Sequence, residues 1–129
     1  MSKAADLANL IGNINAGGGT SGRNVIVNGA MRVAQRGTSF TTVAHAAHTI
    51  DQFRNSKSHD GEVTITQDSS GPDGFANSLK VDVTTADTSI GASQYSAIFA
   101  RIEAQNLQHF KFGTSDAQNI TLSFYVKSN

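Results

Sequence analysis

The sequence predicts an all-β protein, an antiparallel β-sandwich or barrel preceded by a short N-terminal helix and a glycine-rich linker. Apolar residues recur at every second position in several short runs, which is the period of a half-buried strand. Turn-forming groups such as Asp60-Gly61 and Gly71-Pro72-Asp73-Gly74 separate these runs at fairly even spacing. No second long helical pattern follows the linker, which favours a sandwich or barrel over alternating βαβ units.

The first expected element is a helix within residues 1–15, which Ser2 can cap. Its large apolar residues fall on one helical face and are Leu7, Leu10, Ile11 and Ile14. Residues 16–23 have the composition of a flexible linker. Burial of four such side chains, at roughly 1.5–3 kcal/mol each, does not offset the ordering of about 13 residues. We therefore expect this face to anchor or oligomerise the chain.

The body, residues 24–129, is expected to hold about seven strands. They are Asn24–Asn28, Ala30–Gln35, Thr49–Arg54, Glu62–Gln67, Ser78–Thr84, Tyr95–Glu103 and Asn119–Lys127. Asn28-Gly29 favours a tight hairpin between the first two or a sharp β turn, because both residues tolerate positive φ. The final strand has a clear apolar face but no following partner. Either it lies between earlier strands, or the chain is the front part of a longer protein.

Size and composition exclude several classes of function. The 129 residues suit one globular unit, and ten basic residues balance ten acidic ones, so no overall field attracts nucleic acid. The chain has no cysteine, which excludes disulfides, thiolate zinc sites and cysteine nucleophiles. We find neither a signal-peptide pattern nor an apolar run of roughly 20 residues, so we expect no membrane insertion.

Potential metal ligands occur without a complete ligand set. His45 and His48 have the spacing of two ligands on a helix, but no third ligand lies beside them and they read as a surface loop. Asp60-Gly61 and the loop Asp68–Asp73 could offer oxygens to calcium, yet turn formation explains both. The sequence therefore predicts no metal and no cofactor.

The residues also form no recognisable catalytic frame. Asp51 and Glu103 are carboxylates on expected strands, as glycoside hydrolysis requires. Each has an arginine nearby, Arg54 and Arg101 respectively, which favours a structural ion pair or an edge charge over catalysis. No nucleophile elbow is present. We expect no catalytic residue.

Three residues are candidates for a ligand site or an interface: Arg36, Tyr95 and Tyr125. Arg36 follows an apolar run, where it could reach a carboxylate and pin the turn, or bind a ligand or a neighbouring subunit. The pinning role is the favoured interpretation. The two tyrosines, with Phe40 and Phe75 behind them, are the best residues for stacking on a sugar.

Four segments of the chain occur in a characteristic order: NVIVNGAMRVAQRGTSF at 24–40, IDQF at 50–53, RIEAQNL at 101–107 and ITLSFYVKS at 120–128. Together they resemble a group of bacteriophage virion proteins common in marine and cyanobacterial phages. The resemblance implies a jelly-roll domain similar to carbohydrate-binding modules, carried on tail fibres, tail spikes or other exposed virion proteins. Asp51-Gln52-Phe53 replaces the Asp-Arg-Trp of the group, which removes a cation and a large aromatic ring. The group also continues with further strands beyond its last shared segment.

The leading hypothesis is a non-enzymatic structural and attachment protein of the virion, assembled in the host cytoplasm. It would be a tail fibre or similar appendage, anchored through its N-terminal segment to other virion proteins and forming a homotrimer. The alternatives are a module that binds host surface glycan during host attachment, and a head decoration or head fibre. A polysaccharide depolymerase is the weakest hypothesis, because this chain has no set of carboxylates in a recognisable catalytic frame.

Overall fold

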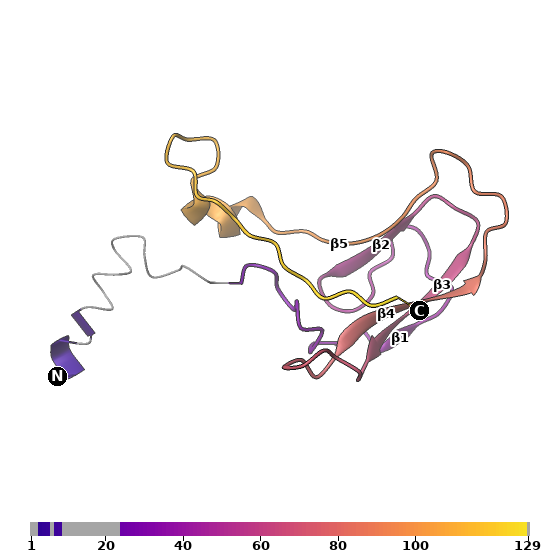
Figure 1. The fold of residues 1–129 in the computed structure, drawn as a ribbon, viewed down its shortest axis with the longest axis horizontal. Coiled ribbons are helices and arrows are strands. Elements are labelled where there is room, and N and C mark those ends of the chain that lie inside the picture. The colour runs from indigo at the N-terminus through magenta and orange to yellow at the C-terminus, as the bar shows by residue number, and fades with distance from the viewer. Residues whose placement is uncertain (1–2, 6, 9–23, 129) are drawn as a thin grey trace. The chain divides into compact units, whose positions relative to one another are not determined.

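The computed structural model describes residues 3–5, 7–8 and 24–128, and within residues 24–128 its regular elements are short strands and a 3₁₀ helix (Figure 1). The elements are β1 (Ser39–Phe40), β2 (Phe53–Lys57), β3 (Glu62–Asp68), β4 (Ser78–Thr85), β5 (Ser96–Ala100) and η1 (Ala104–Phe110). All five strands belong to one compact unit, built from residues 26–101 and 122–128. Residues 102–121, with η1, belong to another.

The strands form two antiparallel sheets. One has the order β1-β3-β4, and the other pairs β2 with β5. In the first sheet Ile65 lies opposite Val81, and Val63 lies opposite Val83. This antiparallel, mostly β architecture confirms the all-β prediction.

The core lies between the two sheets. Val43, Val63 and Ile65 form one buried cluster, against which the half-buried Ile98 of β5 and Leu79 of β4 pack. Ile65 is fully buried, as expected for the central strand of its sheet.

Residues 24–35 form a turn and irregular backbone, so the expected strands Asn24–Asn28 and Ala30–Gln35 are wrong, and the sharp turn is the alternative that forms. Asn28 does adopt the left-handed conformation, with φ 59°, and its carbonyl accepts a hydrogen bond from Met31 N at 2.9 Å. Its side-chain amide, however, donates to Val33 O and accepts from Val33 N, both at 2.9 Å. A two-stranded ladder would use the N–H and C=O of Val33, but both groups are already hydrogen-bonded to the Asn28 side chain.

Other strand boundaries also differ from the prediction. The expected strand Thr49–Arg54 is displaced to β2, because residues 50–53 form a turn in which Phe53 N donates to Ile50 O at 2.8 Å. The expected strand Tyr95–Glu103 ends at Ala100, and η1 follows where none was predicted. β3 and β4 match the expected strands to within one residue.

The expected final strand, Asn119–Lys127, is not a strand in the structure. Its alternating residues Ile120, Leu122, Phe124 and Val126 are 63%, 69%, 75% and 83% exposed. The period-2 pattern is present, but no neighbouring strand covers it.

Little of the expected N-terminal helix can be compared. Residues 3–5 and 7–8 have helical backbone, and Leu7 is 57% exposed. Leu10, Ile11, Ile14 and the linker at 16–23 lie outside the described residues. None of the helical segments that the structure describes has the length and hydropathy to cross a membrane.

Candidate interaction surface

The core side of β4 is largely uncovered. Because directly opposed residues of an antiparallel pair point to the same face, Val81 and Val83 share the face of Ile65 and Val63. Yet Val81 is 41% exposed and Val83 69%, whereas Ile65 and Val63 are 0% and 3% exposed. The second sheet therefore shields β3 but leaves β4 open.

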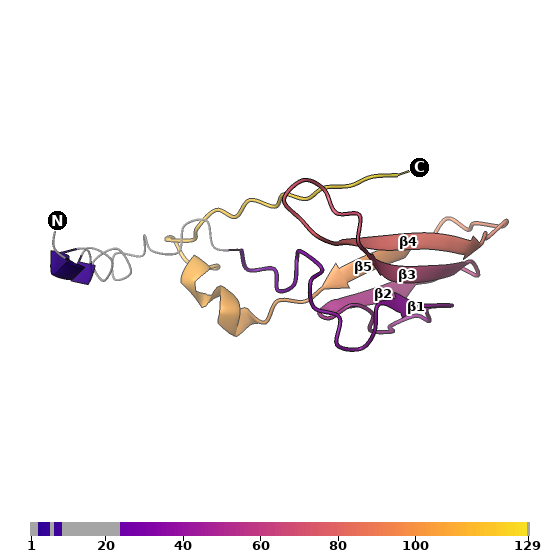
Figure 2. The same cartoon turned by 90° about the horizontal axis from the view of Figure 1, so that it is seen from below.

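The tail, residues 122–128, adds a second set of exposed apolar side chains. Figure 2 shows it running past β4 on the side away from β3. No strand pairing joins it to β4, which ends its sheet among the described residues. The open face of β4 and the tail thus form an apolar surface of the kind that marks an interaction site.

An exposed aromatic pair lies within this surface. Phe75, in the connection between β3 and β4, meets Tyr125 of the tail edge to face, with ring centroids 5.8 Å apart. Phe75 is 42% exposed and Tyr125 75%. The structure therefore brings together two of the four aromatic residues selected from the sequence.

The other two aromatic candidates have local partners. The Tyr95 hydroxyl lies 3.2 Å from Ser56 Oγ, and its backbone N–H donates to Ser58 Oγ at 3.1 Å. Phe40 packs against the buried cluster. Tyr95 remains half exposed, and Phe40 contributes to the core.

Charged groups border the apolar surface. Asp68 accepts a hydrogen bond from Ser70 N at 2.7 Å, and this bond, with help from Lys80 and Lys127, lowers the pKa of the Asp68 carboxyl. The hydrogen-bonded ion pair with Asp82, at 2.9 Å, raises the pKa of Lys80. Lys80 and Asp82 lie on the opposite face of β4 from Val81.

Arg36 does not pin the turn, contrary to the favoured interpretation. The Asp51 carboxylate accepts instead from the backbone N–H of Gln35, at 2.6 Å, and Asn28 Nδ2 donates to Asp51 O at 2.9 Å. The Arg36 side chain is exposed, and within residues 24–128 no carboxylate forms an ion pair with it. Its role at a ligand or interface stays a prediction.

The expected ion pairs of the two strand carboxylates do not form. Arg54 Nε donates to Ala46 O at 2.7 Å, and the Arg101 guanidinium lies over the Phe99 ring at 5.3 Å. Glu103 accepts from Gln105 Nε2 at 2.6 Å. Backbone and aromatic partners have replaced the predicted carboxylate partners of both arginines.

The two histidines singled out in the sequence have separate local roles. His45 Nδ1 lies 2.8 Å from Lys57 O. The backbone of His48 forms an isolated antiparallel β-bridge with that of Arg54. Within the described part of the chain, no group of three or more acidic or histidine side chains gathers as a metal site would require.

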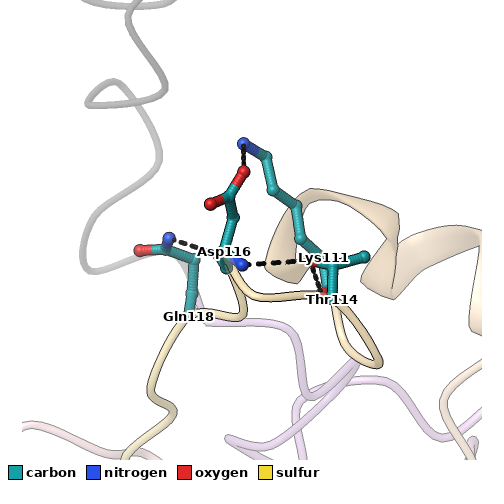
Figure 3. A network of polar contacts seen from close by, with 4 residues as sticks. All are labelled: Lys111, Thr114, Asp116 and Gln118. Atoms are coloured by element: carbon teal, nitrogen blue, oxygen red, sulfur yellow. Dashed lines mark hydrogen bonds and ion pairs between the residues drawn. The ribbon is translucent and has the colours of Figure 1, made fainter.

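A polar network closes the turn that follows η1 in the other unit (Figure 3). Thr114 Oγ1 donates to Lys111 O at 2.8 Å and accepts from Asp116 N at 3.2 Å. Lys111 Nζ lies 3.9 Å from the Asp116 carboxylate, and Gln118 Nε2 donates to Asp116 O at 3.0 Å. These contacts hold the turn, and the open hollow beside them is lined by Ala104, Leu107, Gln108, Lys111, Phe112 and Thr114.

Comparison with protein-family models, with curated proteins and with solved structures finds no match to this chain. The surface must therefore be interpreted from its own chemistry. Sequence reasoning missed its main part, the open face of β4. Apolar and charged residues alternate from Leu79 to Val83, which predicts a strand with one apolar face. The pattern does not indicate which element packs against that face.

Proposed function

We propose that this chain is a non-enzymatic structural and attachment module of a bacteriophage virion. It belongs to a tail fibre or similar appendage, is anchored through its N-terminal segment to other virion proteins, and forms a homotrimer. Its two sheets are part of a jelly-roll sandwich, and assembly takes place in the host cytoplasm. The resemblance of four ordered segments to phage virion proteins supports the particle assignment.

One observation carries the binding role: the apolar face of β4 and the tail are exposed together. Val83, Phe124 and Val126 are each at least 69% exposed. At roughly 25 cal/mol per Å² of apolar area, covering these side chains favours association with another protein surface. Virion assembly supplies such surfaces at high local concentration.

Deletion of residues 2–16 tests the anchoring role. We expect the truncated chain to retain its β-sheet circular dichroism and to be lost from purified virions of the phage that encodes it. The full-length chain, introduced in the same way, is the control. Truncated chain that still co-purifies with particles at the full-length level would contradict the anchor, and full-length chain missing from particles would contradict the virion role.

The Phe75–Tyr125 pair favours glycan binding as a second function. Two exposed rings 5.8 Å apart offer the apolar faces on which sugars stack. Binding of host surface polysaccharide would then occur beside the tail, with host attachment as the outcome.

Two substitutions at one position separate the sugar role from a packing role. Tyr125→Ala removes the ring and should abolish binding of host polysaccharide in a glycan array or by calorimetry. Tyr125→Phe keeps the ring and should retain most of the affinity. Equal binding by both variants, or no binding by the unmodified chain, would set the glycan function aside.

A further inference from the structure

β4 has an unpaired backbone edge, and its residue order suits pairing with a copy of itself. Among the described residues, β4 ends the β1-β3-β4 sheet, so its second edge presents free N–H and C=O groups. We propose that two copies of the chain pair their β4 strands antiparallel about a two-fold axis at Val81. The contact extends the sheet from three strands to six, β1-β3-β4-β4-β3-β1.

The register explains why a second copy is the fitting partner. With Val81 opposite Val81 of the other copy, Leu79 lies opposite Val83, and Lys80 lies opposite Asp82. Apolar residues meet on the core face, and opposite charges meet on the other face. Cross-strand pairs of both kinds stabilise a sheet by roughly 0.2–1 kcal/mol each. The two-fold axis forms the Leu79–Val83 and Lys80–Asp82 pairs twice and the Val81–Val81 pair once.

The neighbouring symmetric registers are disfavoured by charge. An axis at Lys80 sets two lysines directly opposite each other, and an axis at Asp82 does the same with two aspartates. Like charges in these positions are destabilising. The charge of Lys80 therefore disfavours pairing of this edge with most strands. In the register centred on Val81, Asp82 of the other copy compensates that charge.

The tail of the same chain is a poorer partner for this edge. Figure 2 shows it running in the same direction as β4, so it could add to this edge only as a parallel strand, and parallel pairing is slightly less stable per residue than antiparallel pairing. Its side chains and Val83 also remain mostly exposed, so neither covers the other. The tail is left available for the partners discussed above.

The contact goes beyond the virion role and does not depend on it. It is also distinct from trimer formation through the N-terminal segment. A single pair of strand edges buries less than the roughly 1,200 Å² of a stable interface, so the association is weak and is sought at high protein concentration.

A single introduced thiol tests the register, because the chain has no cysteine of its own. In Val81→Cys the two thiols face each other, with Cα atoms about 4.5–5.5 Å apart, which a disulfide can span. In the control, Val83→Cys, the two thiols are four residues out of register, about 13 Å apart along the strand. We expect oxidation of the full chain to give a disulfide dimer with Val81→Cys only. Equal cross-linking of both variants, or none, would overturn the proposal.

Charge exchange provides an independent test. Lys80→Glu places two acidic residues opposite each other, and Asp82→Lys places two lysines opposite each other, so neither variant should pair with itself. Mixed together, the variants set Glu against Lys and Asp against Lys, and pairing should return. Fluorescence energy transfer between labelled full-length chains measures this.

The mixture is compared with each variant alone, so that any trimer exchange contributes equally to all three samples. Circular dichroism confirms that both variants fold, as expected for side chains that are 47% and 46% exposed. We expect energy transfer in the mixture to exceed that in either variant alone. The same energy transfer in all three samples would show that association uses another surface, and would refute the pairing.

Discussion

At the scale of single residues, side-chain amides and carboxylates take over turn hydrogen bonds that a strand ladder would otherwise supply. Asn28 bonds both backbone groups of Val33 and also the carbonyl of Asp51, while the Asp51 carboxylate holds Gln35 N. This arrangement fixes residues 28–35 against the turn before β2. It also explains why an ion pair of Arg36 is not needed to hold this turn.

Two substitutions of Asn28 separate its backbone role from its side-chain role. Asn28→Gly keeps the positive φ but loses the amide bonds, whereas Asn28→Ala loses both. A left-handed conformation costs an ordinary residue about 1–2 kcal/mol, and each lost hydrogen bond costs about 0.5–1.5 kcal/mol. We expect both variants to be less stable in urea unfolding, with Asn28→Ala the lower by about 1 kcal/mol. Equal stability of the two would show that the backbone conformation is not strained.

Asp68 gives the stability of the β3–β4 connection a pH dependence. The pKa of Asp68 is lower in the folded protein than its ordinary value. At pH values between these two pKa values, the folded state therefore binds fewer protons than the unfolded state. The stabilisation is therefore present above the ordinary pKa and is lost as the pH falls through the folded one. In urea unfolding, Asp68→Asn should be less stable than the unmodified protein near neutral pH, and the difference should shrink in acid. A constant difference would contradict this assignment.

At the scale of elements, sequence patterns located strands best where both partners are close along the chain. β3 and β4 were predicted almost to the residue, because Val63 and Ile65 alternate with polar residues and a turn-rich connection follows. β2 was displaced because the apolar Ile50 belongs to a turn rather than to the strand. η1 was missed because its apolar residues, Ala104, Leu107 and Phe110, span only 7 residues, which is too short a stretch to show a helical period.

The candidate site was predicted in part. Tyr125 and Phe75 were chosen as exposed aromatics, but their contact depends on the path of the tail, which no local pattern encodes. The tail itself has the strongest alternation in the chain, yet alternation indicates only that one face suits burial. A strand also requires hydrogen bonds to a partner edge, and none of the strand pairings among the described residues includes the tail.

The tail therefore contributes little to the stability of the sheets. Leu122→Ala and Phe124→Ala should each change the free energy of unfolding by no more than about 0.5 kcal/mol, because both side chains are already exposed. Ile65→Ala, the buried control, should cost about 2–5 kcal/mol. Thermal or urea unfolding compares the three. A loss above about 2 kcal/mol for either tail variant would mean that the tail is part of the core.

At the scale of the whole molecule, the proposed pairing makes protection from hydrogen exchange depend on concentration. Amides of β4 that face the free edge should exchange quickly in dilute protein and more slowly as the concentration rises. Those of β3 that bond to β4, and those of Ile65 and Thr66 opposite β1, are already paired within the chain and should not change. Mass spectrometry of peptides covering 78–85 and 62–68 measures both. A uniform change in the two peptides would indicate non-specific association.

The strand pairings are also nested, and this sets an order of folding. β2 pairs with β5 across a loop that contains the whole β3–β4 hairpin, so early formation of the hairpin shortens the loop that must close afterwards. A Cβ at Gly71 would overlap the Phe75 carbonyl in the hairpin connection, so Gly71→Ala should slow refolding in stopped-flow measurements. Ile98→Val in β5 should instead leave the refolding rate nearly unchanged and accelerate unfolding.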